Sequence, residues 1–227
     1  MTLQHVDILF KLIVFLFAIS VHESAHAWMA SRRGDPTARM LGRVTLNPIK
    51  HIDPIGTVLL PLIAMVSHFP MLGWAKPTPV DPRNFKNPVL DDILTSVAGP
   101  VSNFLLATGA LIVLALVKVS SPLGRQIVFG ILHGLISPEI GSILVPACLL
   151  LYELMFINVL LGVFNLIPVP PLDGSHVLRH FLSPSTLRIY DTVGIFALMA
   201  LVFLGGGLLG KLIYPVIDTF NYVLLRI

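Results

Sequence analysis

The chain has 227 residues, of which 55% are hydrophobic and only 12% are charged, whereas about 25% of the residues of a soluble globular domain are charged. This composition excludes a disordered chain, a collagen-like chain and an ordinary cytosolic enzyme, and it favours a helical protein that crosses a lipid bilayer several times. The net charge of +3 comes with basic residues that lie between the apolar runs, where they set membrane orientation, so we expect no nucleic-acid partner.

The first apolar stretch predicts a transmembrane helix from about Val6 to Ala30. We do not interpret it as a signal peptide, because no basic region precedes it and no small-residue cleavage site follows it. Four more apolar runs follow, at 54–73, 93–117, 141–167 and 189–210. Residues 74–92 contain four prolines and are expected to form a loop or short extended pieces. We interpret the apolar tail, 212–227, as an interfacial helix, so the fold class is an all-α polytopic membrane protein with about five to six transmembrane helices.

The first predicted helix contains His22-Glu23-Ser24-Ala25-His26, an H-E-x-x-H pattern. Histidines four residues apart lie on one face of a helix, about 6 Å apart along its axis, so both imidazoles can reach one zinc ion. Glu23 can hold a water molecule and accept its proton as a general base. Ionisable groups cost about 2–3 kcal/mol each at membrane depth, which favours a functional metal site over a polar contact between helices.

A catalytic zinc ion needs a third protein ligand, and six acids or histidines lie in or near later apolar runs: His133, Glu139, Glu153, Asp173, His176 and Asp191. Asp173 stands out because it follows Asn165-Leu-Ile-Pro-Val-Pro-Pro-Leu, in which the prolines break the helix. Free backbone groups at membrane depth are tolerated only where they are buried in protein or line a wet cavity. Two histidines and one aspartate also suit iron or cobalt, so the residue types leave the metal open.

The pair of motifs H-E-x-x-H and N-x-x-P-x-P-x-L-D-G resembles the site-2 protease family of intramembrane zinc metalloproteases. The resemblance covers about residues 7–183 and includes the element Gly99-Pro100-Val101-Ser102-Asn103. Two segments, 53–57 and 73–77, are similar to a short prokaryotic form without PDZ or CBS domains. The resemblance implies a single integral-membrane domain over 1–227, with a three-helix catalytic core within 7–183 and C-terminal helices at about 186–227.

The resemblance also implies roles for individual residues. His22, His26 and Asp173 match the ligands of one zinc ion per chain, and Glu23 matches the catalytic acid and base. Asn165 matches the asparagine that steadies the substrate carbonyl or oxyanion. Two further residues, Asn103 and His176, could contact the ligands from outside, with packing between helices and a polar helix contact as the respective alternatives. The implied substrates are membrane proteins with a transmembrane segment, and the family activity is peptide-bond hydrolysis.

The depth of the two motifs places a constraint on the topology. Five basic residues within 31–50 predict that this segment is cytoplasmic, so the first helix runs inward and the zinc site lies nearer the cytoplasmic face of a prokaryotic cell membrane. If 54–73 crossed the bilayer, Asp173 would fall near the outer face, away from the histidines. We therefore predict that 54–73 enters and returns, with the short apolar piece 126–136 as the alternative source of the missing change of direction.

The sequence is also compatible with two other functions. A metal transporter could use the same histidines as a permeation site, although it would need several sites along a path and would leave Glu23 unexplained. A non-catalytic membrane scaffold would not require an intact set of ligands and acid. The segments 76–88 and 167–171 are candidate edges for an extended substrate. The substrate and the oligomeric state are left open by the sequence.

Overall fold

A computed structural model describes residues 3–60, 63, 74–135, 142–203 and 206–227. All regular secondary structure in these residues is helical, and five helices are long and apolar enough to cross a membrane. The long helices are α1 (Leu3–Arg33), α4 (Pro88–Ser120), α6 (Leu144–Asn165), α8 (Pro184–Phe203) and α9 (Gly206–Arg226). The shorter ones are α2 (Thr37–Met40), η1 (Pro48–Lys50), η2 (Pro54–Leu59), η3 (Pro82–Asn84), α5 (Pro122–His133) and α7 (Asp173–Arg179). The predicted all-helical membrane fold is confirmed for the described residues.

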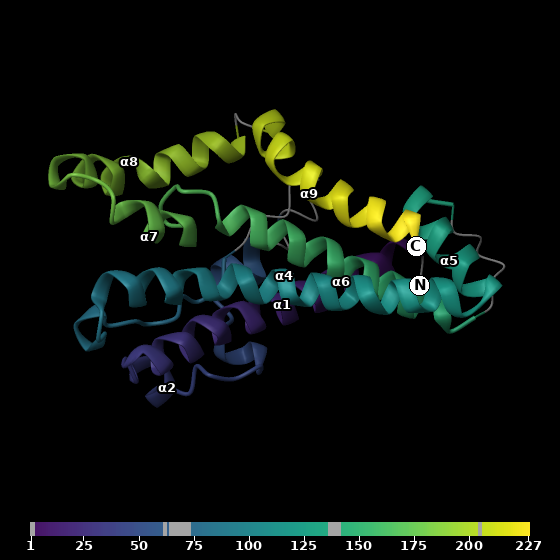
Figure 1. The fold of residues 1–227 in the computed structure, drawn as a ribbon, viewed down its shortest axis with the longest axis horizontal. Helices are drawn as coiled ribbons and strands as arrows, with labels where there is room; N and C mark the ends of the chain where they lie inside the picture. Colours follow the sequence, from purple (N-terminus) through teal and green to yellow (C-terminus); the bar gives the residue numbers. More distant parts are fainter. Residues whose placement is uncertain (1–2, 61–62, 64–73, 136–141, 204–205) are drawn as a thin grey trace.

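Three helices, α1, α4 and α6, pack side by side and form the centre of the molecule (Figure 1). α1 and α6 run in the same direction, and α4 runs in the opposite direction between them. Ala18 and Ile19 of α1 are buried against Ile157 of α6, and Leu114 of α4 is buried in a second cluster with Met155 of α6. Apolar packing therefore fixes α6 against both other helices.

An ion pair joins the end of α1 to the start of α4. The Nε and Nη2 atoms of Arg33 lie 2.6 and 2.5 Å from Oδ1 of Asp91, a fully buried carboxylate. α4 begins at Pro88, where a proline costs no helical hydrogen bond, five residues before the predicted apolar run. It continues through Pro100 without a break. The ion pair brings the ends of α1 and α4 together near the predicted site.

The start of the segment 54–73 lies beside Trp74, the first described residue after that segment. The backbone N–H of Trp74 donates to the carbonyl of Gly56 (3.2 Å), and the Thr57 hydroxyl donates to the carbonyl of Trp74 (2.8 Å). Residues 61–62 and 64–73 lie outside the described residues, so the prediction that 54–73 enters and returns stays a prediction. α5 has 12 residues and spans about 18 Å, too short for a hydrocarbon core of about 30 Å. This length argues against 126–136 as a full crossing.

The C-terminal boundaries differ from those expected from the sequence. Gly206–Arg226 forms one helix, α9, so the break lies before Gly206 and not between the predicted run 189–210 and the tail 212–227. Glycine has a low helix propensity, which favours a helix end at this point. The helix boundary expected between 210 and 212 is therefore wrong. α9 is long and apolar enough to cross a membrane, and its residues Ile213 and Ile217 are buried in the cluster formed with α4 and α6.

Candidate metal centre

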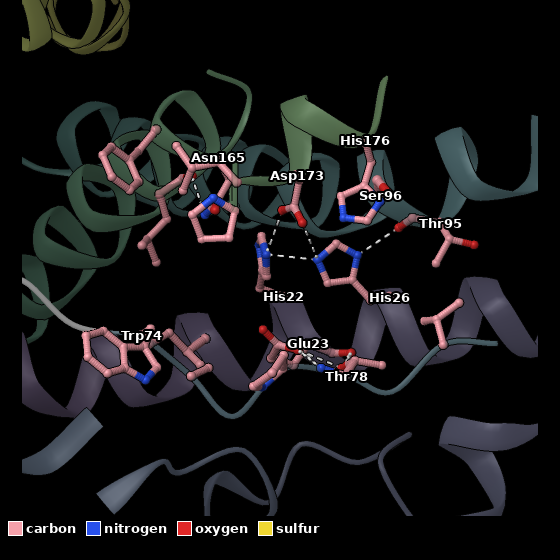
Figure 2. Close-up of a pocket in the computed structure, with 18 of the residues that line it drawn as sticks. His22, Glu23, His26, Trp74, Thr78, Thr95, Ser96, Asn165, Asp173 and His176 are labelled. Atoms are coloured by element: carbon pink, nitrogen blue, oxygen red, sulfur yellow. Dashed lines mark hydrogen bonds and ion pairs between the residues drawn. The ribbon is translucent and has the colours of Figure 1, made fainter. Parts of the chain in front are cut away.

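His22 and His26 on α1 meet Asp173, the first residue of α7 (Figure 2). The two histidine Nε2 atoms are 3.0 Å apart. The Nε2 atom of His22 lies 3.1 Å from Oδ2 of Asp173, and that of His26 lies 3.3 Å from Oδ1. Among the described residues, these three form the one group of acids, histidines or cysteines whose ligand atoms all lie within 4.8 Å of one another. The structure thus brings together the three ligands expected from the sequence.

Three ligand atoms about 2.0–2.1 Å from one tetrahedral zinc ion lie roughly 3.3 Å apart, close to the separations observed here. Oδ2 of Asp173 is buried and makes no hydrogen bond, and it faces Nε2 of His22. The donor set of two imidazoles and one carboxylate is that of catalytic zinc sites. The residues present therefore fit a zinc ion.

Hydrogen bonds on the far side of each imidazole orient the two histidines. Nδ1 of His22 donates to Oδ1 of Asn103 (2.6 Å), and Nδ1 of His26 donates to the carbonyl of Thr95 (2.7 Å). Asn103 in turn donates to Oδ1 of Asn158 (2.7 Å). With the proton on Nδ1, each Nε2 atom would present its lone pair to a metal ion held at this site. Asn103 thus both contacts a ligand and packs between helices.

Gly99 allows α4 to approach the histidines. A Cβ atom at this position would lie 2.4 Å from Nε2 of His26 and 2.6 Å from Cε1 of His22. Any side chain here would therefore displace the imidazoles or the helix. This contact gives a physical reason for the glycine in the element Gly99-Pro100-Val101-Ser102-Asn103, which the sequence alone does not explain.

The loop between α6 and α7 brings Asp173 to the histidines. The prolines at 168, 170 and 171 end the helical pattern after Asn165, and the chain then turns into α7. A Cβ atom on Gly174 would lie 2.3 Å from the carbonyl oxygen of Leu166. Only glycine therefore permits the first turn of α7 to pack against the end of α6, which places Asp173 over α1.

Glu23 lies beside the two histidines, and its carboxylate contacts the extended segment after Trp74 (Figure 2). Oε2 of Glu23 accepts hydrogen bonds from the backbone N–H (2.9 Å) and the hydroxyl (2.6 Å) of Thr78. One cavity of about 510 Å³ is lined by Glu23, by Thr78 and by the triad, the name used here for His22, His26 and Asp173. Apolar side chains from α1 and α6 line it as well, namely Phe15, Ile19, Leu161 and Phe164.

Asn165 and His176, which the sequence also predicted for the site, line this cavity but make no hydrogen bond to the triad in the described part of the chain. Nδ2 of Asn165 donates to the carbonyl of Leu161 within its own helix (3.0 Å). Nδ1 of His176 lies 3.5 Å from Oδ1 of Asp92 on α4. The other oxygen of Asp92, Oδ2, accepts a hydrogen bond from Nε2 of His180 (2.8 Å). His176 thus joins α7 to α4.

Two buried charged residues hold the loops beneath the cavity. The carboxylate of Asp35 accepts bonds from Thr37, Asn84 and the backbone of Asp81. Burial alone would raise the pKa of Asp35, but these donors outweigh it and lower the pKa. The guanidinium of Arg43 donates to carbonyls of residues 50, 76 and 77, and burial lowers its pKa from the ordinary value.

Sequence reasoning missed three residues that contact the site. Asn158 carries a detectable signal, since it is a polar residue in an apolar run and lies seven positions before Asn165. Thr95 acts through its backbone carbonyl, which no residue type reveals. Thr78 lies in the segment 76–88, which the sequence predicted as a candidate substrate edge, but no motif indicates its contact with Glu23. Only the folded chain brings Thr95 and Thr78 to the site.

Comparison with known proteins gave two kinds of match. The family model for Peptidase family M50 matches residues 10–205. The chain is 38% identical to "Putative zinc metalloprotease YwhC" of Bacillus subtilis (strain 168) over 175 residues, which cover 77% of this chain and 70% of that protein. It is 27% identical to "Putative zinc metalloprotease Rip2" of Mycobacterium tuberculosis (strain ATCC 25618 / H37Rv), over 84% of this chain and 64% of that protein. The match thus spans less than two thirds of Rip2. No solved structure gave a significant match.

Proposed function

The chain belongs to peptidase family M50, and from this premise we propose that it is an intramembrane zinc endopeptidase that hydrolyses peptide bonds in proteins with a transmembrane segment. The convergence of His22, His26 and Asp173 in one cavity with Glu23 carries the proposal. The three ligands bind one zinc ion per chain, and residues 1–227 act as a single integral-membrane domain. The five long apolar helices support its placement in the bilayer.

Glu23 acts on the water molecule that attacks the scissile carbonyl carbon. A zinc ion at this site would lower the pKa of water and polarise the carbonyl group. Glu23 accepts one proton from the water as the new C–O bond forms, and it returns that proton to the nitrogen as the C–N bond breaks. The products are a carboxyl group and an amine, and the Glu23 carboxylate is regenerated.

Asn165 donates a hydrogen bond to the oxygen of the scissile carbonyl, on which negative charge develops. Its position at the end of α6 and on the cavity wall supports this role. Its amide now donates to the carbonyl of Leu161. Substrate binding would exchange this bond for one to the substrate, which keeps the amide paired in both states.

The substrate binds as an extended strand, because a peptide bond inside a transmembrane helix is shielded by the helical hydrogen bonds. The segment 74–80 supports this proposal, since Ala75, Pro77, Thr78 and Val80 all line the cavity. The loop 167–171 is the second candidate edge, and Pro171 lines the cavity from that side. A cross-linker placed in residues 76–88 should form adducts with the bound substrate, most of all at positions that line the cavity. The absence of any adduct would contradict this step.

The cavity lies nearer the cytoplasmic face of a prokaryotic cell membrane. The basic residues that follow the first helix support this orientation by the positive-inside rule. The histidines lie in the C-terminal half of α1, which runs toward that face. A cysteine placed after α1, for example at the exposed Met40, should react with a membrane-impermeant thiol reagent only in inverted vesicles.

The decisive experiment compares cleavage of a model single-span substrate by purified wild-type protein and by Glu23→Gln in detergent. We expect cleavage by the wild type alone, with about one zinc ion bound to each protein. Glu23→Gln keeps the size of the side chain and removes its capacity to accept a proton. Cleavage by both proteins would overturn the role of Glu23, and zinc-free wild type that cleaves would overturn the metal site.

The two alternative functions predict a different result for the same variant. A metal transporter or a scaffold should largely retain its activity in Glu23→Gln, because neither requires a general base. The part of the chain that the structure describes contains one metal-binding group and no series of such groups along a path. This observation favours the peptidase over the transporter.

A further inference from the structure

Thr78, which lies outside the two predicted motifs, makes three contacts with Glu23. Its backbone N–H and its hydroxyl both donate to Oε2 of Glu23, at 2.9 and 2.6 Å. The same hydroxyl lies 3.1 Å from the backbone carbonyl of Glu23. Both hydrogen bonds from Thr78 to the carboxylate end on Oε2, so they restrain the side chain through one oxygen and leave Oε1 for another partner.

Anchors before Thr78 hold its segment in place. The backbone N–H of Lys76 donates to the carbonyl of His51 (2.9 Å). The guanidinium of Arg43 donates to the carbonyl of Lys76 and to that of Pro77 (2.9 Å). Arg43 and His51 are 5% and 1% exposed, so these anchors belong to the packed interior and do not depend on solvent-exposed side chains.

The chain after Thr78 is anchored as well. The backbone N–H of Asp81 donates to the buried carboxylate of Asp35 (2.8 Å). Pro77 and Pro79 flank Thr78 and restrict its backbone, because a proline fixes its own φ and forces the residue before it into an extended conformation. Thr78 therefore presents its N–H and hydroxyl from a segment with little freedom to move.

We propose that Thr78 is a positioning residue that holds Oε2 of Glu23, so that Oε1 is aimed at the water molecule in the reaction. The inference rests on the proposed peptidase function, because it assigns a task to Thr78 in that reaction. A glutamate side chain has three rotatable bonds, and a general base works only when it is within hydrogen-bond reach of the proton. Restraint by two donors reduces the conformations in which the base is out of reach.

The same segment also lines the cavity as a candidate edge for the substrate. One rigid element thus contacts both the base and the proposed path of the peptide. The position of Glu23 relative to the scissile bond is then determined by a short stretch, 76–80. Loss of the Thr78 hydroxyl should therefore lower kcat more than it raises KM, because it disturbs the base and leaves the substrate edge in place.

The test compares Thr78→Val with Thr78→Ser under steady-state cleavage of the model substrate. Valine keeps the shape and the backbone N–H but removes the hydroxyl, whereas serine retains the hydroxyl. We expect Thr78→Val to lower kcat about tenfold or more, the effect of losing a hydrogen bond to a charged group, with a smaller change in KM. Thr78→Ser should recover most of kcat. All variants should bind zinc as the wild type does.

Thr57→Val is the matched control. The Thr57 hydroxyl anchors the start of the same segment through the carbonyl of Trp74 but does not contact Glu23. If Thr78 only anchors the loop, the two valine variants should change KM and kcat in the same way, which would overturn the proposal. An unchanged kcat in Thr78→Val would also overturn it, and a raised kcat would show that the contact restrains the base unproductively.

Two further measurements separate the possible failures. Cleavage by the wild type and none by Glu23→Gln establishes the proposed function whatever the Thr78 variants do. Thermal unfolding and zinc content show whether each variant is folded. If Thr78→Val is not recovered as a folded protein, Thr78→Ala provides the same comparison with serine.

Discussion

The three-helix core and the C-terminal helices differ in how they are held. Half of the apolar stretch of α1 is buried inside the protein, against 6% for α8 and 11% for α9. Polar contacts join the helices of the core to one another. Arg33 of α1 pairs with the buried carboxylate of Asp91 on α4, and Asn103 of α4 links His22 of α1 to Asn158 of α6. α8 and α9 expose large apolar side chains over most of their length.

This difference shows which part of a membrane protein can hold polar and ionisable side chains. Polar and ionisable side chains are costly in the bilayer unless they pair with one another or face a wet cavity. The core provides both conditions, since the fully buried carboxylate of Asp91 is paired with Arg33 and the helices enclose the cavity lined by His22, His26 and Asp173. α8 and α9 provide neither over most of their surface, which suits contact with lipid.

The largest expected effect comes from Gly99→Ala in the core. Its Cβ atom would lie 2.4 Å from Nε2 of His26, so the imidazole or α4 must move. We expect loss of most of the bound zinc and a fall in kcat of more than about hundredfold, because misplacement by about 1 Å can cost that much. Metal analysis and cleavage assays on the purified variant measure both.

Gly109→Ala on the same helix is the control, because nothing lies within 4 Å of its added Cβ atom. It should keep its zinc and gain slightly in stability, since alanine favours a helix by up to about 1 kcal/mol over glycine. Equal zinc content in the two variants would show that the space at Gly99 is not needed for the site.

A smaller effect is expected for Asn103→Ala, which removes the acceptor for Nδ1 of His22. Loss of such an outer hydrogen bond weakens metal affinity about 10- to 100-fold. Competition with a chelator should show this change in the zinc dissociation constant. Asn47→Ala, at an exposed helix cap away from the triad, should leave the affinity unchanged, and an equal shift in both would refute the assignment.

The smallest effect is expected where α9 meets the core. Nζ of Lys118 donates to the carbonyls of Leu224 and Leu225, each at 2.8 Å. Lys118→Met keeps the apolar stem but removes both bonds, so the free energy of unfolding should fall by about 1–3 kcal/mol. Zinc content and kcat should remain those of the wild type. Thermal unfolding in detergent, beside the exposed Lys211→Met as control, measures the difference, and a loss of zinc would contradict the separation of the two regions.

The elements with strong local patterns were predictable. Composition and apolar runs predicted an all-helical membrane protein, because spans need long apolar stretches. The prolines of 74–92 predicted the loop over 74–87, but the prediction is wrong for 88–92, where Pro88 begins α4. The start of the last helix was misplaced, since residues 206–210 continue the apolar pattern, whereas α9 begins at Gly206 and includes Ile213 and Ile217. Boundaries inside a continuous apolar run carry little local signal.

The H-E-x-x-H spacing and the cost of charge in a bilayer were sufficient to predict His22, Glu23 and His26 as one site, because both are local properties. Asp173 was one of six candidates, and the prolines before it and the family resemblance singled it out. Which groups orient those side chains was decided only by the tertiary structure. Thr78 reaches Glu23 across 55 positions, and Asn103 reaches His22 across 81. Such contacts depend on how three helices and a proline-rich loop pack, and no spacing along the chain encodes them.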